Sequence, residues 1–258
     1  MAFDTDLTAC AALVEKADPA RFLAVMAVPV PARRVLFPLF ALNIEVARAP
    51  WVTEESMIAE MRLQWWRDAL SEISAGGIVR RHEVVTPLSQ VLAPALATRL
   101  DEMVAARRWD IYRDPFEDEA HFDRYIDATS GHVISAAAQS LGRADETVLR
   151  DFAYGVGIAN WLCAVPELEA RRRVPLLDGT GEGVGKLAQK ALDRLQKARS
   201  QRAKVSPEAG QALFSGWQAS RLLRQVIADP SRVGDGRLGG IDTRDRLALM
   251  LRVSRGRW

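Results

Sequence analysis

Residues 35–47 read VLFPLFALNIEVA and carry two adjacent apolar rows at helical spacing. The members of each row recur every three or four positions, and the second row lies beside the first. The rows are Val35, Leu39, Leu42 and Val46, and Leu36, Phe40, Asn43 and Ala47. A helix that is apolar around so much of its circumference is buried on most sides. We therefore predict a central helix here, with Pro38 favouring a kink.

Helical periodicity continues on both sides of this segment, and no segment shows the alternation of a strand. Asp18-Pro19 and Ser206-Pro207 have the residue types that begin helices. Apolar spacing predicts further helices over 59–73, over 149–163 with its end at Pro166, over 184–198 and over 212–226.

The expected breaks, at 76–81, 113–118, 175–183 and 229–240, are too short to be interdomain linkers. We therefore predict one all-α domain, residues 1–258, built as a helical bundle of about eight to ten helices.

Composition and charge exclude several classes of protein. The chain has 258 residues, 48% of them hydrophobic, and a net charge of only +2, so a nucleic-acid partner is not expected. Two cysteines, Cys10 and Cys163, cannot form a disulfide framework. The acidic N-terminus lacks the character of a secretory signal peptide, and the longest uncharged stretch, 152–166, is shorter than a transmembrane helix. We expect a cytoplasmic protein, or one peripheral on a membrane.

Two partial motifs lack the residues that their chemistry needs. The glycine-rich stretch 179–186 has Thr180 and Leu187 where a phosphate-binding loop needs glycine and serine or threonine. His82-Glu83 lacks the second histidine of a zinc protease at position 86, which is threonine. A loop followed by a helix start is the simpler interpretation of the first motif, and we expect no metal site from the histidines.

Four stretches, taken in order, resemble the squalene/phytoene synthase family. They are residues 39–47, 61–70, 125–131 and 157–177, within a similarity that covers roughly residues 18–228. The resemblance implies the all-α isoprenoid synthase fold. It also implies a prenyltransferase reaction, in which clustered aspartates hold Mg²⁺ ions that stabilise a departing diphosphate.

The chain departs from the family at those aspartates. The first motif would begin at position 47, where the chain has Ala47, Arg48 and Trp51 in place of three aspartates. The second would begin at Asn160, which matches, as does Glu167. Its arginine and two aspartates are replaced by Cys163, Ala164 and Leu168. We therefore expect no metal cofactor and no metal-dependent catalysis. An active prenyltransferase that uses Mg²⁺ in an atypical site remains the alternative.

The stretches ALNIEVA and MRLQWWR, residues 41–47 and 61–67, are similar to a branch of the family that lacks the aspartate motifs. Members of that branch act in the biogenesis of respiratory complex I at the inner membrane. The resemblance implies a non-catalytic assembly factor, or one that binds an isoprenoid or lipid, with respiratory-complex assembly partners.

The remaining polar and aromatic residues of these stretches are candidates for a ligand pocket. They are Asn43, Glu45, Arg62, Gln64, Trp65, Tyr125, Ser130 and Asn160. Arg171 and Arg173 are candidates for phosphate binding, although a run of arginines is usually a solvated surface. A charged Glu45 on a buried helix needs a partner, for which Arg62 or Arg67 is suited. An interior ion pair beside packed tryptophans is the simpler interpretation, and a pocket for an isoprenoid or lipid tail is the functional one.

The C-terminal tail, residues 237–258, interleaves arginines with apolar residues. Leu247, Met250 and Leu251 are spaced to share one helical face, and Trp258 is suited to an interfacial anchor. A polybasic segment gains about 1 kcal/mol per basic residue near an anionic membrane, so we expect weak, salt-sensitive membrane binding. A final helix packed against the body, or one that binds a partner, is the alternative.

Overall fold

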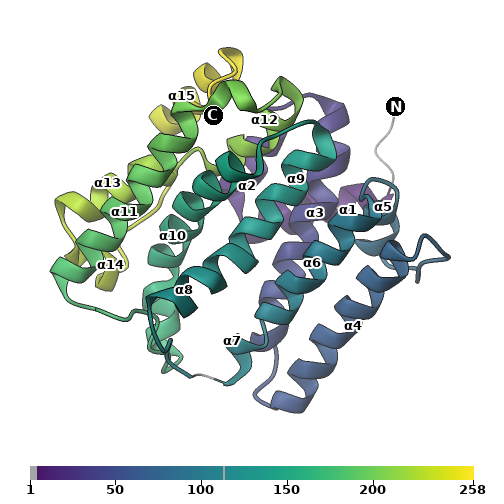
Figure 1. Cartoon of the computed structure of the whole chain (residues 1–258), viewed down its shortest axis with the longest axis horizontal. Helices are drawn as coiled ribbons and strands as arrows, with labels where there is room; N and C mark the ends of the chain where they lie inside the picture. The colour runs from purple at the N-terminus through teal and green to yellow at the C-terminus, as the bar shows by residue number, and fades with distance from the viewer. Residues whose placement is uncertain (1–4, 113) are drawn as a thin grey trace.

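The computed structural model describes residues 5–112 and 114–258, which fold into helices joined by short loops (Figure 1). In these ranges the only extended pairing is an isolated bridge between Ala144 and Val205. The all-α prediction is confirmed. Twelve of the helices in the described ranges have seven residues or more, against the eight to ten expected, because loops and irregular turns divide several segments.

Four helices are the longest: α3 (Val30–Arg48), α4 (Ser56–Ser74), α10 (Glu146–Ala170) and α11 (Gly181–Ser200). The other α-helices are α1 (Thr5–Ala17), α2 (Pro19–Met26), α5 (Val85–Ser89), α6 (Pro94–Ala106), α7 (Trp109–Tyr112), α8 (Glu119–Ile126), α9 (His132–Leu141), α12 (Pro207–Leu213), α13 (Ala219–Ala228), α14 (Ser231–Gly234) and α15 (Thr243–Ser254). Short irregular helices are η1 (Ala49–Trp51), η2 (Asp127–Gly131), η3 (Arg202–Lys204) and η4 (Phe214–Gly216).

Helix α3 is the central helix that its two apolar rows predict. It packs against α1, α2, α5, α9 and α12, and its residues from Leu36 to Leu42 are all buried. Helix α10 is the second buried helix and lies between α9 and α11 (Figure 1). The site described below lies between these two helices.

Side-chain caps begin several helices where the sequence predicts them. Asp18 Oδ1 accepts a hydrogen bond from the backbone N–H of Arg21 at 2.9 Å, and Ser206 Oγ accepts one from Ala209 at 3.3 Å. Thr180 caps α11 by accepting from the N–H of Gly183 at 3.1 Å. The glycine-rich stretch is therefore a loop and a helix start, as the simpler interpretation has it.

Two predicted boundaries are wrong. Helix α10 continues through Pro166 to Ala170, because Val165 and Leu168 are buried and this packing offsets the one backbone hydrogen bond that proline cannot donate. The predicted helix over 212–226 is divided by η4. At Gly216 a Cβ atom would lie 2.3 Å from Val156 Cγ2, so the chain turns there in close contact with α10.

The C-terminal tail forms α15, which the packed-helix alternative describes better than an exposed anchor. Trp258 is only 8% exposed, and its ring packs edge-on against Phe152 with the centroids 5.2 Å apart. The prediction that Trp258 anchors the chain in a membrane is therefore wrong. Leu247, Met250 and Leu251 are exposed, as the expected apolar face requires. Within the described ranges, no helix has the length and apolar character needed to cross a bilayer.

Candidate functional site

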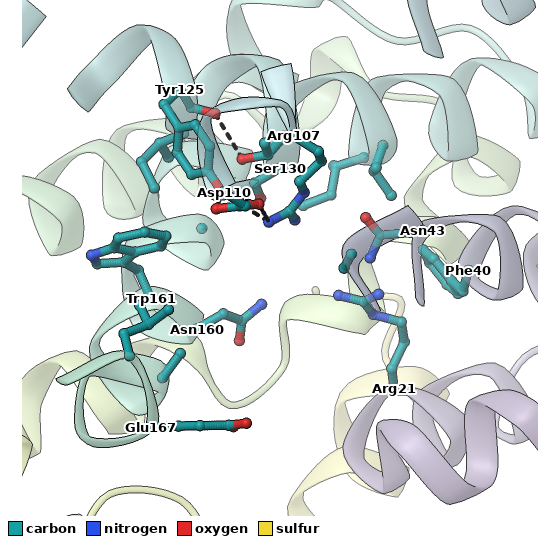
Figure 2. A pocket seen from close by; sticks show the side chains of 18 of the residues that line it. Arg21, Phe40, Asn43, Arg107, Asp110, Tyr125, Ser130, Asn160, Trp161 and Glu167 are labelled. Carbon is teal, nitrogen blue, oxygen red and sulfur yellow. Dashed lines mark hydrogen bonds and ion pairs between the residues drawn. The ribbon is translucent and has the colours of Figure 1, made fainter. Parts of the chain in front are cut away.

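A cavity of about 310 Å³ opens between α2, α3, η2 and α10. Figure 2 shows polar side chains converging on it from several elements: Arg21 from α2, Asn43 from α3, Arg107 from the end of α6, and Asn160 from α10. Apolar side chains, among them Phe40, Ile134, Trp161 and Leu168, form the rest of the wall. The cavity therefore combines an apolar lining with charged groups.

Three polar side chains form a buried cluster on one wall of this cavity. The hydroxyl of Tyr125 donates to Asp110 Oδ1 at 2.8 Å and accepts from Arg107 Nη1 at 2.9 Å. Arg107 Nη1 also lies 3.2 Å from Asp110 Oδ2. The Asp110 side chain is only 2% exposed and that of Arg107 18% exposed, so the cluster is shielded from water.

Burial and charge act in opposite directions on the two titratable partners of Asp110. Burial disfavours the charged guanidinium of Arg107, but its contacts with Tyr125 and Asp110 outweigh this effect and raise the pKa of Arg107. Burial raises the pKa of the Tyr125 hydroxyl, so the phenol stays protonated. The cluster therefore consists of one cation, one carboxylate and one neutral hydroxyl.

Arg173 supports this cluster from behind instead of facing the cavity. Its Nη1 donates to the backbone carbonyl of Asp110 at 3.0 Å, and its guanidinium lies 4.1 Å from the ring centroid of Trp109. Arg173 itself is buried. The prediction that Arg173 binds phosphate is therefore wrong, because the fold of residues 171–175 turns its side chain into the protein.

The element η2 (Asp127–Gly131) is a π-helical turn that joins α8 directly to α9, and Thr129 and Ser130 on this turn line the cavity. Such turns are frequent at functional sites. Helix α10 approaches the turn at Gly157, where a Cβ atom would lie 2.8 Å from both Ile126 Cγ2 and Ser130 Cβ. Glycine is therefore required for this close approach.

The mouth of the cavity is formed by Trp51, Glu167 and Arg171. Arg171 Nη2 donates to Glu167 Oε1 at 2.7 Å, and its guanidinium lies 4.9 Å from the Trp51 ring centroid. The Glu167 side chain is 71% exposed. Arg171 can therefore exchange its exposed carboxylate partner for an anionic group of a ligand at the mouth.

The structure brings together about half of the predicted pocket residues. Asn43, Tyr125, Ser130, Asn160 and Arg171 line the cavity. Glu45, Arg62, Gln64 and Trp65 do not.

The predictions for these four residues are wrong because of the faces that their helices present. Glu45 lies on the rim of α3 and pairs with Arg48 at 2.9 Å. Arg62 and Gln64 face solvent on α4, and Trp65 packs against Trp66 and His82.

The expected interior pair between Glu45 and an arginine of 62–67 is absent, because Arg67 binds Asp101 at 2.8 Å instead. We predict that Glu45→Ala changes the free energy of unfolding by less than about 1 kcal/mol, as expected for an exposed ion pair. Urea denaturation of the single variant and of the Glu45→Ala/Arg48→Ala double variant tests this. A loss of several kcal/mol would show that Glu45 has an essential buried partner.

Sequence analysis missed three residues of the site: Arg21, Arg107 and Asp110. In the sequence, Arg21 is the third residue after the predicted cap Asp18. This position predicts the helix that contains Arg21 but not the direction in which its side chain points. Asp110 stands between Trp109 and Ile111, and an acid among large apolar residues is a weak sign of burial. Nothing local in the sequence connects Arg107 with Tyr125, which lies on another helix.

The model of the family described as squalene/phytoene synthase matches residues 14–176, well over half of the chain and most of the residues that line the cavity. The chain belongs to the squalene/phytoene synthase family. A search of curated proteins gave no match.

Two solved structures of squalene/phytoene synthase type resemble the fold. A dehydrosqualene synthase solved in complex with a ligand is 14% identical, with a TM-score of 0.78, and the match covers 97% of this chain and 95% of that one. The squalene synthase HpnC from Alicyclobacillus acidocaldarius is 16% identical, with a TM-score of 0.69, covering 91% and 95%. These similarities confirm the isoprenoid synthase-like fold that the resemblance implies.

The carboxylates of this family member do not fit the Mg²⁺ ions that the fold implies. Asp110 Oδ1 already accepts a hydrogen bond from the Tyr125 hydroxyl and Asp110 Oδ2 one from Arg107 Nη1, and Glu167 pairs with Arg171 at the exposed mouth. At expected aspartate positions the cavity wall has Ala47 and Ala164, which offer no oxygen ligand. No group of three metal-binding side chains occurs in residues 5–112 and 114–258.

Proposed function

We propose that this squalene/phytoene synthase family member binds an isoprenoid or similar lipid without ionising it. One observation carries the proposal: at the family's aspartate positions the cavity has Ala47, Trp51 and Ala164, while its buried acid, Asp110, is neutralised by Arg107. The apolar wall suits a hydrocarbon chain, and the arginines suit an anionic head. An active prenyltransferase with an atypical site is the alternative, favoured by the three arginines that line the cavity.

A turnover assay distinguishes lipid binding from prenyltransferase activity. We expect the purified protein, given Mg²⁺ and farnesyl or geranylgeranyl diphosphate, to release no more pyrophosphate than a heat-killed sample. The reason is that the carboxylates that would hold a diphosphate-bridging Mg²⁺ ion at the cavity are replaced by Ala47, Trp51 and Ala164. A dehydrosqualene synthase assayed in parallel is the positive control. Steady turnover that disappears in an Arg107→Ala variant would establish the enzyme instead.

Binding is tested separately from catalysis. Titration calorimetry with farnesyl diphosphate, and mass spectrometry of lipids that co-purify with the protein, measure occupancy directly. Ala164→Phe places a ring in the cavity and should weaken binding strongly. Cys163→Phe is the matched control, because the same ring is added at an exposed neighbouring position. Equal binding by both variants would place the ligand elsewhere.

The wider role that we propose is assistance in the assembly of respiratory complex I, at the cytoplasmic side of an anionic inner membrane. It is supported by the resemblance of residues 41–47 and 61–67 and by the exposed apolar residues Leu247, Met250 and Leu251 of α15. Deleting the gene and measuring assembled complex I on native gels tests this role. Unchanged complex I in the deletion strain would exclude it, with lipid binding left intact.

A further inference from the structure

Helices α11, α13 and α15 lie on one flank of the molecule (Figure 1). On this flank, outside the cavity, the charges of four arginines interact with one another. Arg199 Nη1 donates to the hydroxyl of Ser220, and Arg252 Nη1 donates to the backbone carbonyl of Trp217 at 2.8 Å. Both guanidiniums are therefore held beside the N-terminal end of α13. Arg224 follows Ser220 by one turn and shares its helical face. Arg202, in η3, is the fourth arginine and donates to the backbone carbonyl of Arg199 at 3.0 Å.

The charges of this arginine cluster are not neutralised by the protein. Within residues 5–112 and 114–258, none of the ion pairs involves Arg199, Arg224 or Arg252. The Nε and Nη2 atoms of Arg199 are buried and have no hydrogen-bond partner in the same ranges. By contrast, the neighbouring Arg194 binds Asp151 at 2.8 Å. Donors that are buried without an acceptor are costly to the folded state.

The positive charges of the arginine cluster repel one another and lower the pKa values of two of its members. Burial, together with the charges of Arg252, Arg224 and Arg202, lowers the pKa of Arg199 to about 10. Burial, together with the charge of Arg224, lowers the pKa of Arg252. Partly buried arginines normally pair with carboxylates. Because Arg199, Arg224 and Arg252 have no such partner in the described ranges, the cluster lacks an anion that would neutralise its charge.

We propose that Arg199, Arg224 and Arg252 form a binding site for a phosphate group. Guanidiniums present several N–H donors in a plane that matches phosphate oxygens, and several of them together suit a multiply charged anion. The phosphate group belongs either to a soluble phosphate compound or to the headgroup of an anionic lipid. This site lies on other helices than the cavity, and the inference does not depend on the proposed function.

Thermal denaturation with inorganic pyrophosphate tests the site. At about ten times its dissociation constant, pyrophosphate should raise the Tm by about 3–6 °C, beyond the effect of sodium chloride at equal ionic strength. Arg224→Gln should lose most of this shift. Because Arg224 is exposed and repels its neighbours, the variant without pyrophosphate should melt no lower than wild type.

Two control variants separate this site from others. Arg62→Gln removes an exposed arginine of α4, and Arg21→Gln removes an arginine of the cavity. Arg62→Gln should keep the whole pyrophosphate shift, and Arg21→Gln should keep the part of the shift that Arg224→Gln removes. A shift that survives Arg224→Gln and Arg252→Gln, or that is lost in Arg21→Gln, would overturn the proposal.

Vesicles identify the source of the phosphate group. Co-sedimentation with phosphatidylglycerol vesicles, competed by pyrophosphate and weakened by Arg224→Gln, would identify a lipid headgroup; phosphatidylcholine vesicles are the neutral control. Pyrophosphate stabilisation without vesicle binding would identify a soluble phosphate compound. If pyrophosphate did not stabilise the protein and the vesicles did not bind it, the result would show that the arginine cluster binds no phosphate group.

Discussion

Asp110→Ala is expected to lower the free energy of unfolding by about 3–5 kcal/mol, the usual loss when one partner of a buried ion pair is removed. The variant leaves Arg107 charged beside the cavity and the Tyr125 hydroxyl without its acceptor. For a chain of this length the Tm should fall by roughly 6–20 °C. Urea and thermal denaturation, followed by circular dichroism, measure both quantities.

Asp101→Ala is the matched control for this experiment. Asp101 also pairs with an arginine, Arg67, but their side chains are 30% and 34% exposed, so the loss should stay below about 1 kcal/mol. A second variant, Arg107→Met/Asp110→Ala, also removes the unpaired guanidinium charge of Arg107 and should recover part of the stability. If Asp110→Ala were no more harmful than Asp101→Ala, the buried cluster would contribute little to the fold.

Trp258→Ala is expected to cost about 3 kcal/mol, at the lower end of the range for removing a buried tryptophan, because the residue ends the chain. Its ring fills the space over Gly210, where a Cβ atom would lie 3.0 Å from the indole Nε1, and it packs against Phe152. The loss of this contact should release α15 from the body. Urea denaturation measures the loss, and proteolysis should cut the variant first within α15.

Leu251→Ala provides the comparison on the same helix. Leu251 is 46% exposed, so its truncation should change stability by less than about 0.5 kcal/mol. If Trp258→Ala were as mild as Leu251→Ala while both reduced binding to anionic vesicles, Trp258 would act at a membrane after all.

Helix type, helix starts and the central position of α3 follow from the sequence alone. They depend on residues that are neighbours along the chain: apolar side chains every three or four positions, and the cap residues Asp18 and Ser206. The missing aspartates at positions 47, 48 and 51 are likewise visible without a structure. These features predicted the fold class, and the family model and both structural neighbours confirm it.

The partners of the charged residues were decided only by tertiary structure. The sequence predicts that Glu45 faces α4. Whether a residue of α3 contacts a neighbouring helix or lies at the edge of the helix interface depends on a small rotation of α3 about its axis. The apolar periodicity does not define that rotation. Arg107, Asp110 and Tyr125 meet because the end of α6, the short helix α7 and the end of α8 converge on one wall of the cavity. Trp258 and the arginine cluster depend in the same way on where α15 docks. Local rules fix which residues are helical, whereas the pairing of side chains depends on distances between helices that are far apart in the chain.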